Sequence, residues 1–189
     1  MHSTVREYAL RLNKPQPIVD YLIPLIGFKK EVSILDVGSG PYPITGQYLT
    51  GVSVKTTHCD KQDFAKFWEE LGEEPMVQIE KQDMENLTYP DNSFDIVHCV
   101  NALDHTKDAL AALEEMLRVC KSNGWVYIDC CLDQLTAQGK KHYWDAKEDG
   151  TLVNKIGKID LKGLGFDIEY VDNGGERQYN HVIAKARKA

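Results

Sequence analysis

The sequence has no excess of basic residues, no long hydrophobic run and no recognisable cysteine pattern. Its 22 Lys and Arg residues are outnumbered by 29 Asp and Glu residues, and the net charge is -7. This balance argues against a bulk electrostatic grip on nucleic acid, which needs a basic face. No apolar run approaches the ~20 residues of a membrane span, and the first residues lack the apolar segment of a signal peptide. We therefore expect neither a nucleic-acid nor a membrane partner.

The five cysteines are odd in number and show no metal-type spacing. Three of them, Cys59, Cys99 and Cys130, fall in or at the ends of predicted strands, where a reduced cysteine packs as a small hydrophobic residue. A reducing, cytoplasmic setting fits this usage best.

Short apolar runs alternate with helical stretches, a pattern typical of an α/β domain with a mostly parallel sheet. Seven strands are predicted, at residues 32–37, 52–59, 76–80, 94–100, 125–131, 166–171 and 178–186. Helices are predicted at residues 17–26, 44–49, 63–71 and 110–120, the last one capped by Thr106 or Asp108 and stopped by Asn123-Gly124.

Repeats and convincing linkers are both missing, so the sequence predicts one domain over residues 1–189. Residues 1–30 would form N-terminal helices and residues 31–131 a cofactor-binding core. Residues 132–189 would supply a substrate-side segment and a terminal pair of strands.

The first predicted strand ends in an acid and then turns on two glycines, in the order Asp36, Gly38, Gly40. Glycines let the backbone approach a ligand closely, and the helix predicted at 44–49 would point its free N–H groups at the same place. A dinucleotide loop needs a third glycine where Pro43 stands, and Asp36 would repel a pyrophosphate. S-adenosylmethionine, with its ammonium and sulfonium groups, suits the acid better. A plain strand-to-helix turn is the alternative.

The second and third predicted strands also end in acids. Asp60 lies a little over 20 residues beyond the glycine loop, where an acid can hold both hydroxyls of a ribose. Asp83 could accept a hydrogen bond from an adenine amino group, while the backbone N–H of Met84 meets a ring nitrogen. Ligands of open α/β sheets bind at the carboxyl ends of the strands, so these acids predict a nucleoside site.

Several segments resemble the class I, Rossmann-like S-adenosylmethionine-dependent methyltransferases, in particular type 11. Residues 34–40 (ILDVGSG) are similar to the first motif of that family. Residues 82–97 (QDMENLTYPDNSFDIV) resemble its signature acid-x-x-x-L-P-F-P-D-N-S-F-D-x-V. Residues 101–105 and 113–128 resemble the segment that leaves the fourth strand and the helix, turn and fifth strand. The resemblance covers roughly residues 32–131.

The resemblance implies a three-layer αβα sandwich around a seven-stranded, mostly parallel sheet whose last strand is antiparallel. It also implies S-adenosylmethionine as the cofactor, with the adenosine held by Asp60, Asp83 and Met84. The methionine portion would then lie near Asp36, Gly38, Gly40 and Asn101.

One position departs from the family pattern. Tyr42 stands, between two prolines, where the family usually has a third glycine. Its ring could crowd the cofactor or face the sulfonium through a cation–π contact. Packing against the N-terminal helix is the interpretation that we prefer.

The substrate side is less constrained. His105 follows the fourth strand at the ligand-binding edge and is the predicted general base, with a helix-start residue as the alternative. His142, Tyr143 and Trp144 are the predicted substrate contacts. The expected reaction is methyl transfer to an oxygen or nitrogen of a small molecule or glycan-like acceptor. A catalytically silent scaffold and an NAD-dependent oxidoreductase are the rivals, and a homodimer is possible.

No metal site is predicted. Residues 103–108 resemble the metal-binding stretch of catechol-type enzymes, and Asp104 with Asp129 would offer two oxygen ligands to Mg²⁺. However, Cys130 stands where a third oxygen is wanted, and a thiol is a poor partner for that ion.

Overall fold

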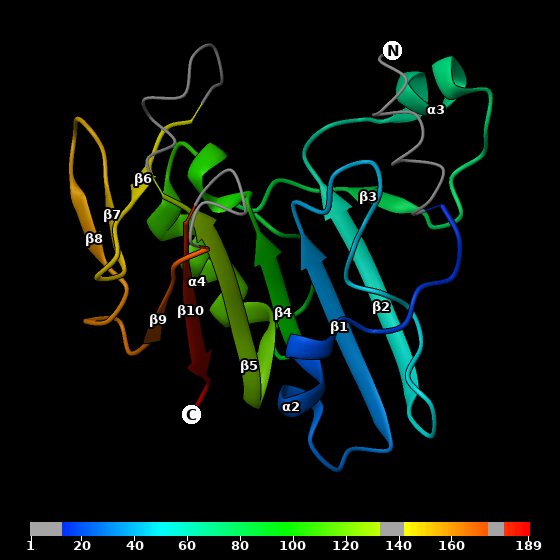
Figure 1. Cartoon of the computed structure of the whole chain (residues 1–189), viewed down its shortest axis with the longest axis horizontal. Helices are drawn as coiled ribbons and strands as arrows, with labels where there is room; N and C mark the ends of the chain where they lie inside the picture. The colour runs from blue at the N-terminus through cyan, green and yellow to red at the C-terminus, as the bar shows by residue number, and fades with distance from the viewer. Residues whose placement is uncertain (1–12, 133–141, 174–179) are drawn as a thin grey trace.

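The structure is a computed structural model that describes residues 13–132, 142–173 and 180–189 (Figure 1). Seven strands form one sheet in the order β3-β2-β1-β4-β5-β10-β9. The first five pair in parallel, and β10 runs antiparallel to both of its neighbours. The predicted fold is thereby confirmed. The strands are β1 (Glu31–Val37), β2 (Ser53–Asp60), β3 (Ile79–Lys81), β4 (Phe94–Val100), β5 (Cys120–Cys131), β9 (Asp167–Val171) and β10 (His181–Arg187).

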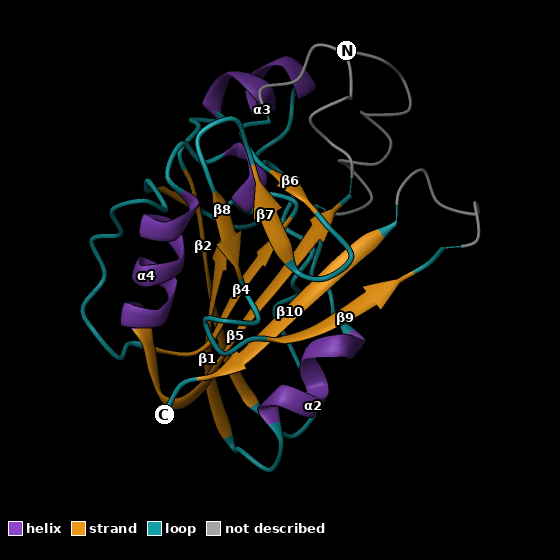
Figure 2. Cartoon of the chain, turned by 90° about the vertical axis from the view of Figure 1, so that its left-hand side faces the viewer, coloured by secondary structure: helices purple, strands orange, loops and turns teal. Residues whose placement is uncertain are grey.

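Helices cover both faces of the sheet, α4 on one and α2 on the other (Figure 2). Side chains alternate along a strand, so Ile34 packs in the cluster that contains α2 residues and Leu35 in the cluster that contains α4 residues. The helical elements are η1 (Asp20–Leu22), α2 (Ile23–Ile26), α3 (Ala65–Leu71), η2 (Leu103–His105) and α4 (Ala109–Val119). None of the helices in the described ranges is long and apolar enough to cross a membrane.

Helix α4 was predicted almost to the residue at its start. Asp108 is the N-cap, and its side chain accepts a hydrogen bond from the Ala111 N–H at 3.0 Å. Its end differs from the prediction, because the helix stops at Val119 and β5 begins at Cys120. Asn123-Gly124 therefore lies within the strand. The helix predicted at 17–26 is also shorter, since within residues 13–30 helical structure begins at Asp20 and ends at Ile26.

The helix predicted at 44–49 after the glycine loop is wrong. This segment runs extended beside the N-terminal one, and the Ile18 N–H donates to the Tyr48 carbonyl at 2.8 Å. Gly46 has a φ of +89°, and a Cβ there would lie 2.1 Å from the Pro17 carbonyl oxygen. The two backbones thus approach too closely for a helix to form at this place, and no helix N-terminus supports the loop.

A second sheet of three short antiparallel strands was not predicted. It consists of β6 (Asp145–Ala146), β7 (Thr151–Val153) and β8 (Lys158–Asp160). Ala146 and Leu152 are buried in the same apolar cluster as α4. The segment that was expected to be free for substrate therefore contributes to the core.

Asp95 ties the start of β4 to β1 from a nearly buried position. One carboxylate oxygen accepts hydrogen bonds from the Ser33 N–H at 2.9 Å and the Ser33 hydroxyl at 2.6 Å. Lys29 Nζ and Lys121 Nζ lie 2.7 and 2.8 Å from its two oxygens. Burial by itself would raise the pKa of Asp95, but the hydrogen bonds from Lys121, Lys29 and Ser33 outweigh burial and hold that pKa well below its usual range.

Replacing Asp95 by Asn should lower the free energy of unfolding by about 1–3 kcal/mol at neutral pH, because buried donors lose a charged acceptor. The folded pKa lies below the unfolded value of about 3.9, so this stabilisation is complete above that pH and is lost as the pH falls. Urea unfolding of both proteins between pH 7 and pH 3 measures it. Asp91→Asn, at an exposed ion pair with Arg118, is the control and should cost less than about 1 kcal/mol. A deficit for Asp95→Asn that stays constant down to pH 3 contradicts the assignment.

Candidate functional site

The glycine loop after β1 is fixed by a close backbone approach. Gly38 and Gly40 have φ values of +68° and +66°. A Cβ on Gly38 would lie 2.4 Å from the Ala102 Cβ, so no larger residue fits between β1 and the segment after β4. The Gly38 and Ser39 N–H groups both donate to the Cys59 carbonyl, at 2.8 and 3.1 Å. A Cβ on Gly40, in contrast, would meet no atom within 4 Å.

Asp60, at the end of β2, holds the far side of this loop. One of its carboxylate oxygens accepts a hydrogen bond from the Gly40 N–H at 3.1 Å, and the other accepts one from the Gln62 N–H at 2.8 Å. The acid that was predicted to bind a ribose is therefore already positioned by two backbone donors. It lies beside the glycine that leaves open space.

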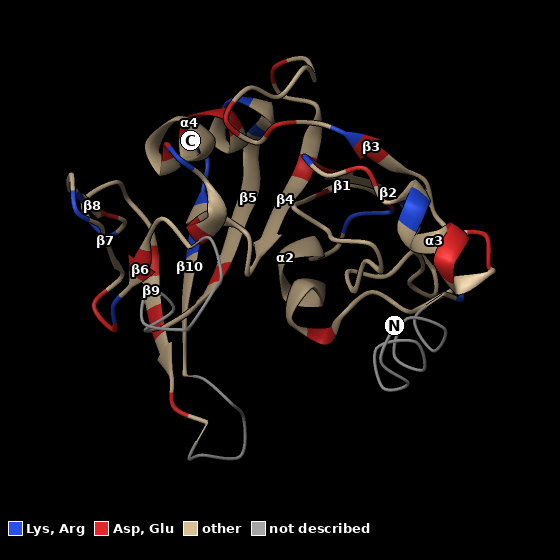
Figure 3. Ribbon diagram, turned by 90° about the horizontal axis from the view of Figure 1, so that it is seen from above, with Lys and Arg blue, Asp and Glu red and all other residues tan. Residues whose placement is uncertain are grey.

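Asp83 follows β3 and forms an ion pair with Lys61, with 2.5 Å between Oδ2 and Nζ. Its other oxygen accepts a hydrogen bond from the Glu85 N–H at 3.2 Å. Burial alone would raise the pKa of Asp83, but the Lys61 hydrogen bond and the Glu85 N–H outweigh burial and lower it. Seen from above the carboxyl ends of the parallel strands, acidic and basic segments lie next to each other at β3 and α3 (Figure 3).

These elements enclose a hollow of about 730 Å³ between the glycine loop, the ends of β2 and β3, and η2, which we call the central cavity. Six of the seven predicted cofactor residues line it, namely Gly38, Gly40, Asp60, Asp83, Met84 and Asn101. His105 and Tyr143 line it as well. Sequence reasoning missed other lining residues, among them Lys61, Phe64, Glu85 and Lys107. Only Lys61, directly after Asp60, carried a signal in the sequence.

Asp36 is the predicted cofactor residue that does not line the central cavity, which corrects the expectation that it faces the ligand. Its side chain is buried, with Oδ2 lying 3.1 Å from His58 Nδ1 and Oδ1 lying 2.8 Å from His98 Nδ1. Burial would raise the pKa of Asp36, but the hydrogen bonds from the two imidazoles dominate and lower it far below its usual range. The rings of Tyr21 and Tyr127 both stack with the ring of His98.

The predicted substrate residues separate into two groups. Tyr143 lines the central cavity, and the His142 ring lies beside that of His105, with 4.4 Å between the ring centroids. His142 Nδ1 is hydrogen-bonded to Asp104 Oδ2. Trp144 is buried in the apolar cluster with α4, so its predicted role in substrate binding is wrong.

Tyr42 is not among the residues that line the central cavity. Its ring lies 6.1 Å from that of Phe67 on α3, measured between centroids. Within the described residues its neighbours are therefore those of α3, while the N-terminal residues 1–12 lie outside the described part of the chain.

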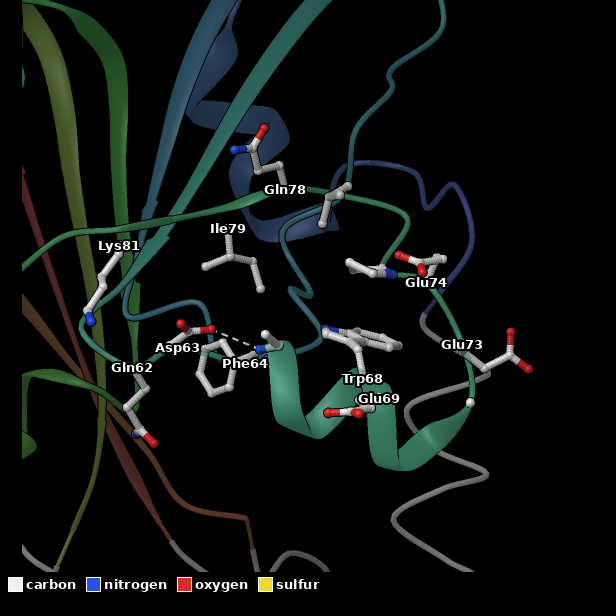
Figure 4. Close-up of a pocket in the computed structure, with 14 residues that line it drawn as sticks. Gln62, Asp63, Phe64, Trp68, Glu69, Glu73, Glu74, Gln78, Ile79 and Lys81 are labelled. Atoms are coloured by element: carbon white, nitrogen blue, oxygen red, sulfur yellow. Dashed lines mark hydrogen bonds between the residues drawn. The ribbon is translucent and has the colours of Figure 1, made fainter.

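A larger hollow of about 1120 Å³ lies between α3 and β3, and we call it the α3 cavity (Figure 4). Phe64 and Trp68 face Ile79 across it, and Glu73 and Glu74 lie at one end. It shares Gln62 and Phe64 with the central cavity but contains no predicted cofactor residue. Size alone therefore does not identify the ligand site, and we assign that site to the central cavity on the chemistry of its walls.

Comparison with known proteins identifies the family of the chain. A family described as a methyltransferase domain matches residues 35–128. The chain belongs to the class I S-adenosylmethionine-dependent methyltransferases. The cofactor that this family implies is S-adenosylmethionine. The matched residues begin in β1 and end in β5, and they include the glycine loop, Asp60 and Asp83.

Curated relatives include an uncharacterised methyltransferase of Schizosaccharomyces pombe, 34% identical over 128 residues, which are 62% of this chain and 44% of the relative. A sterol 24-C-methyltransferase of Gibberella zeae is 30% identical over 111 residues, which are 55% of this chain and 29% of the relative. The methyltransferase thus spans less than half the length of these relatives.

Solved structures show the same fold. A SAM-dependent methyltransferase from Aquifex aeolicus superposes with a TM-score of 0.55 at 22% identity, over 95% of this chain and 97% of that one. The cyclase SpnF gives 0.56 at 18% identity, over 89% and 78% of the two chains. At these identities the likeness concerns the fold alone.

The two cavities make opposite predictions for cofactor binding. Asp60→Asn and Asp83→Asn should each weaken binding of S-adenosylhomocysteine by about 1–3 kcal/mol, because a buried polar group of the ligand loses its acceptor. Asp63→Asn changes an acid that lines only the α3 cavity and should leave the affinity unchanged. Isothermal titration of the three variants measures this. Weakened binding in Asp63→Asn alone would move the adenosine into the α3 cavity.

Proposed function

We propose that this methyltransferase transfers the methyl group of S-adenosylmethionine to an oxygen or nitrogen nucleophile of a small molecule or glycan-like acceptor. The observation that supports the proposal best is the shared wall of the central cavity. It joins the glycine loop and the acids after β2 and β3 to His105 and Tyr143. Donor and acceptor would then meet in one enclosed space, as a direct displacement requires.

The cofactor would extend along one side of the central cavity. Asp60 would hold the ribose hydroxyls, and Asp83 with the Met84 N–H would meet the adenine. Gly38, Gly40 and Asn101 would border the methionine portion. Asn101 has a φ of +51°, and its side-chain oxygen accepts a hydrogen bond from the Cys131 N–H at 3.2 Å, which fixes it at this edge. A volume of about 730 Å³ lies within the range of ordinary ligand pockets, which favours a small acceptor.

His105 is the group we propose to take the proton of the acceptor. It is exposed on η2 and lines the central cavity. An imidazole there can accept a proton from a hydroxyl or an amine while the nucleophile attacks the methyl carbon. Tyr143 would contact the acceptor beside it.

A carbon nucleophile is the second candidate acceptor, because several of the fungal relatives are sterol 24-C-methyltransferases. A catalytically silent relative that only binds the cofactor is the third. The cyclase SpnF, whose name describes another reaction, shows that likeness of fold leaves the reaction open. We also propose that the protein is located in the cytoplasm and that two copies of the chain form a homodimer.

Titration with S-adenosylhomocysteine and with NAD tests the ligand class. The purified chain should bind S-adenosylhomocysteine and not NAD, because Pro43 stands where a dinucleotide loop needs its third glycine. Incubation of S-adenosylmethionine labelled in its methyl group with panels of hydroxyl, amine and sterol-like carbon acceptors then identifies the acceptor class. Binding of NAD alone would refute the proposal, and binding without transfer to any panel would favour the silent relative.

Replacing His105 by Gln should lower kcat about 10²–10⁴-fold, the usual contribution of a positioned acid or base, with the S-adenosylmethionine affinity unchanged. His181→Gln is the control, because it makes the same substitution at a histidine that pairs with Asp129 and does not line the central cavity. Turnover is measured once an acceptor is known. Equal turnover of His105→Gln and the wild type would remove His105 from the reaction.

A further inference from the structure

Three side chains with metal-binding atoms converge beside the central cavity. Asp104 and His105 lie on η2, and His142 lies just before β6. One ligand atom from each of the three lies within 4.8 Å of the other two. We call these residues the Asp104 cluster. His105 opens onto the central cavity, while Asp104 and the His142 side chain are buried, with 4% and 6% of their surface exposed.

Two buried atoms of the Asp104 cluster have no hydrogen-bond partner. Asp104 Oδ2 and His142 Nδ1 bond to each other, and this leaves Asp104 Oδ1 and His142 Nε2 unpaired. Buried polar atoms are nearly always satisfied, because an unpaired one loses its hydration without compensation. A carboxylate oxygen and an imidazole nitrogen left in this state are both electron-pair donors. A cation satisfies such donors.

The backbone holds the Asp104 cluster in place. The Asp104 carbonyl accepts hydrogen bonds from the Tyr143 N–H at 2.7 Å and from the Trp144 N–H at 3.2 Å. The buried Trp144 side chain anchors that strand segment in the core. The residue next to His142 is thereby fixed against η2, so two of the three side chains are preorganised. The third residue, His105, is exposed.

We propose that Asp104, His105 and His142 bind one divalent transition-metal ion at the wall of the central cavity. Two imidazole nitrogens and one carboxylate oxygen suit Zn²⁺ and its first-row neighbours, whereas Mg²⁺ and Ca²⁺ prefer oxygen ligands. Bonds from Zn²⁺ to nitrogen and oxygen are about 2.0–2.2 Å long, so a small rotation of His105 completes the spacing. Three protein ligands leave a fourth position for an exogenous ligand, as in catalytic zinc sites.

The metal site deepens the proposed function and rests on it for the identity of that fourth ligand. An acceptor hydroxyl bound to the metal loses its proton to solvent more readily. The oxygen lone pair then forms the bond to the methyl carbon, and the electrons of the broken carbon–sulfur bond remain on sulfur as S-adenosylhomocysteine. In the metal-bound protein His105 is a ligand, because a nitrogen that binds a cation has no lone pair for a proton. Its role as a base would apply to the metal-free protein.

The ligands proposed here, Asp104, His105 and His142, differ from the pair that we considered from the sequence and rejected. That pair was Asp104 with Asp129, as ligands of Mg²⁺. In the structure Asp129 Oδ1 lies 2.7 Å from His181 Nδ1, and Asp129 is not a member of the Asp104 cluster. His105 and His142 take the place of Asp129 in the proposed ligand set. Because imidazole nitrogens suit Zn²⁺ better than Mg²⁺, the expected ion changes accordingly.

Metal titration of the chelator-treated chain of residues 1–189 tests the proposal without any activity assay. With Zn²⁺ followed by calorimetry and Co²⁺ by its visible absorption, we expect one ion per chain. His105→Gln should weaken binding at least 10-fold, and it alters an exposed residue, so it leaves the fold intact. Asp104→Asn and His142→Gln should weaken binding further. His181→Gln, which changes the histidine that pairs with Asp129, should bind the metal like the wild type.

Wild-type protein that binds no stoichiometric ion would overturn the proposal, and so would equal affinity of the wild type and His105→Gln. The same samples are titrated with S-adenosylhomocysteine in the absence of metal. Cofactor binding without metal binding refutes the metal site and leaves the proposed function standing. Metal binding without cofactor binding supports the metal site and refutes the proposed function.

Discussion

The carboxylate of Asp36 is the interaction on which the ligand-binding edge of the sheet depends. It lies between His58 on β2 and His98 on β4, so one buried charge joins three neighbouring strands near their carboxyl ends. Taking a carboxylate out of water is costly unless its oxygens are hydrogen-bonded, and here both are. The strands are therefore held at a fixed spacing where the chain turns to form the site.

The glycine loop stands directly on this network. Two residues after Asp36 the backbone turns at Gly38, whose N–H bonds to the residue that follows His58. Asp60 then holds Gly40 from the other side. A second set of polar contacts comes from Arg118 of α4, which donates hydrogen bonds to the Leu87 and Tyr89 carbonyls. These bonds fix the loop that follows Asp83 and Met84. Much of the family signature thus serves to position the cavity walls rather than to touch a ligand.

The sequence predicted the parts of the molecule that are governed by local rules. Continuous apolar runs gave β1 and β4, the 3.6-residue period with an Asp cap gave α4, and strand-end acids gave Asp60 and Asp83. The failures have a common cause in contacts between distant segments. Nothing near residues 44–49 reveals that Gly46 lies against Pro17, and nothing near Asp36 reveals that two histidines from other strands meet it.

The substrate side failed for a related reason. The strands of the second sheet have two or three residues each, which is too short for a period to be visible. Trp144 was predicted to contact the substrate, but its side chain is buried in the core. The His142 ring lies beside that of His105, and its pairing with Asp104, 38 residues away in the sequence, is visible only in the fold.

The close approach of Gly46 to Pro17 has a mechanical consequence for the site. Residues 16–18 and 45–48 are joined by backbone hydrogen bonds, and the second of these segments continues from the glycine loop without an intervening helix. A force or a bound molecule that displaces one segment therefore displaces the other. By linkage, a molecule that bound residues 16–18 and shifted the loop would change the cofactor affinity by the same factor by which the cofactor would change the binding of that molecule. The position of the glycine loop therefore depends on the position of residues 16–18.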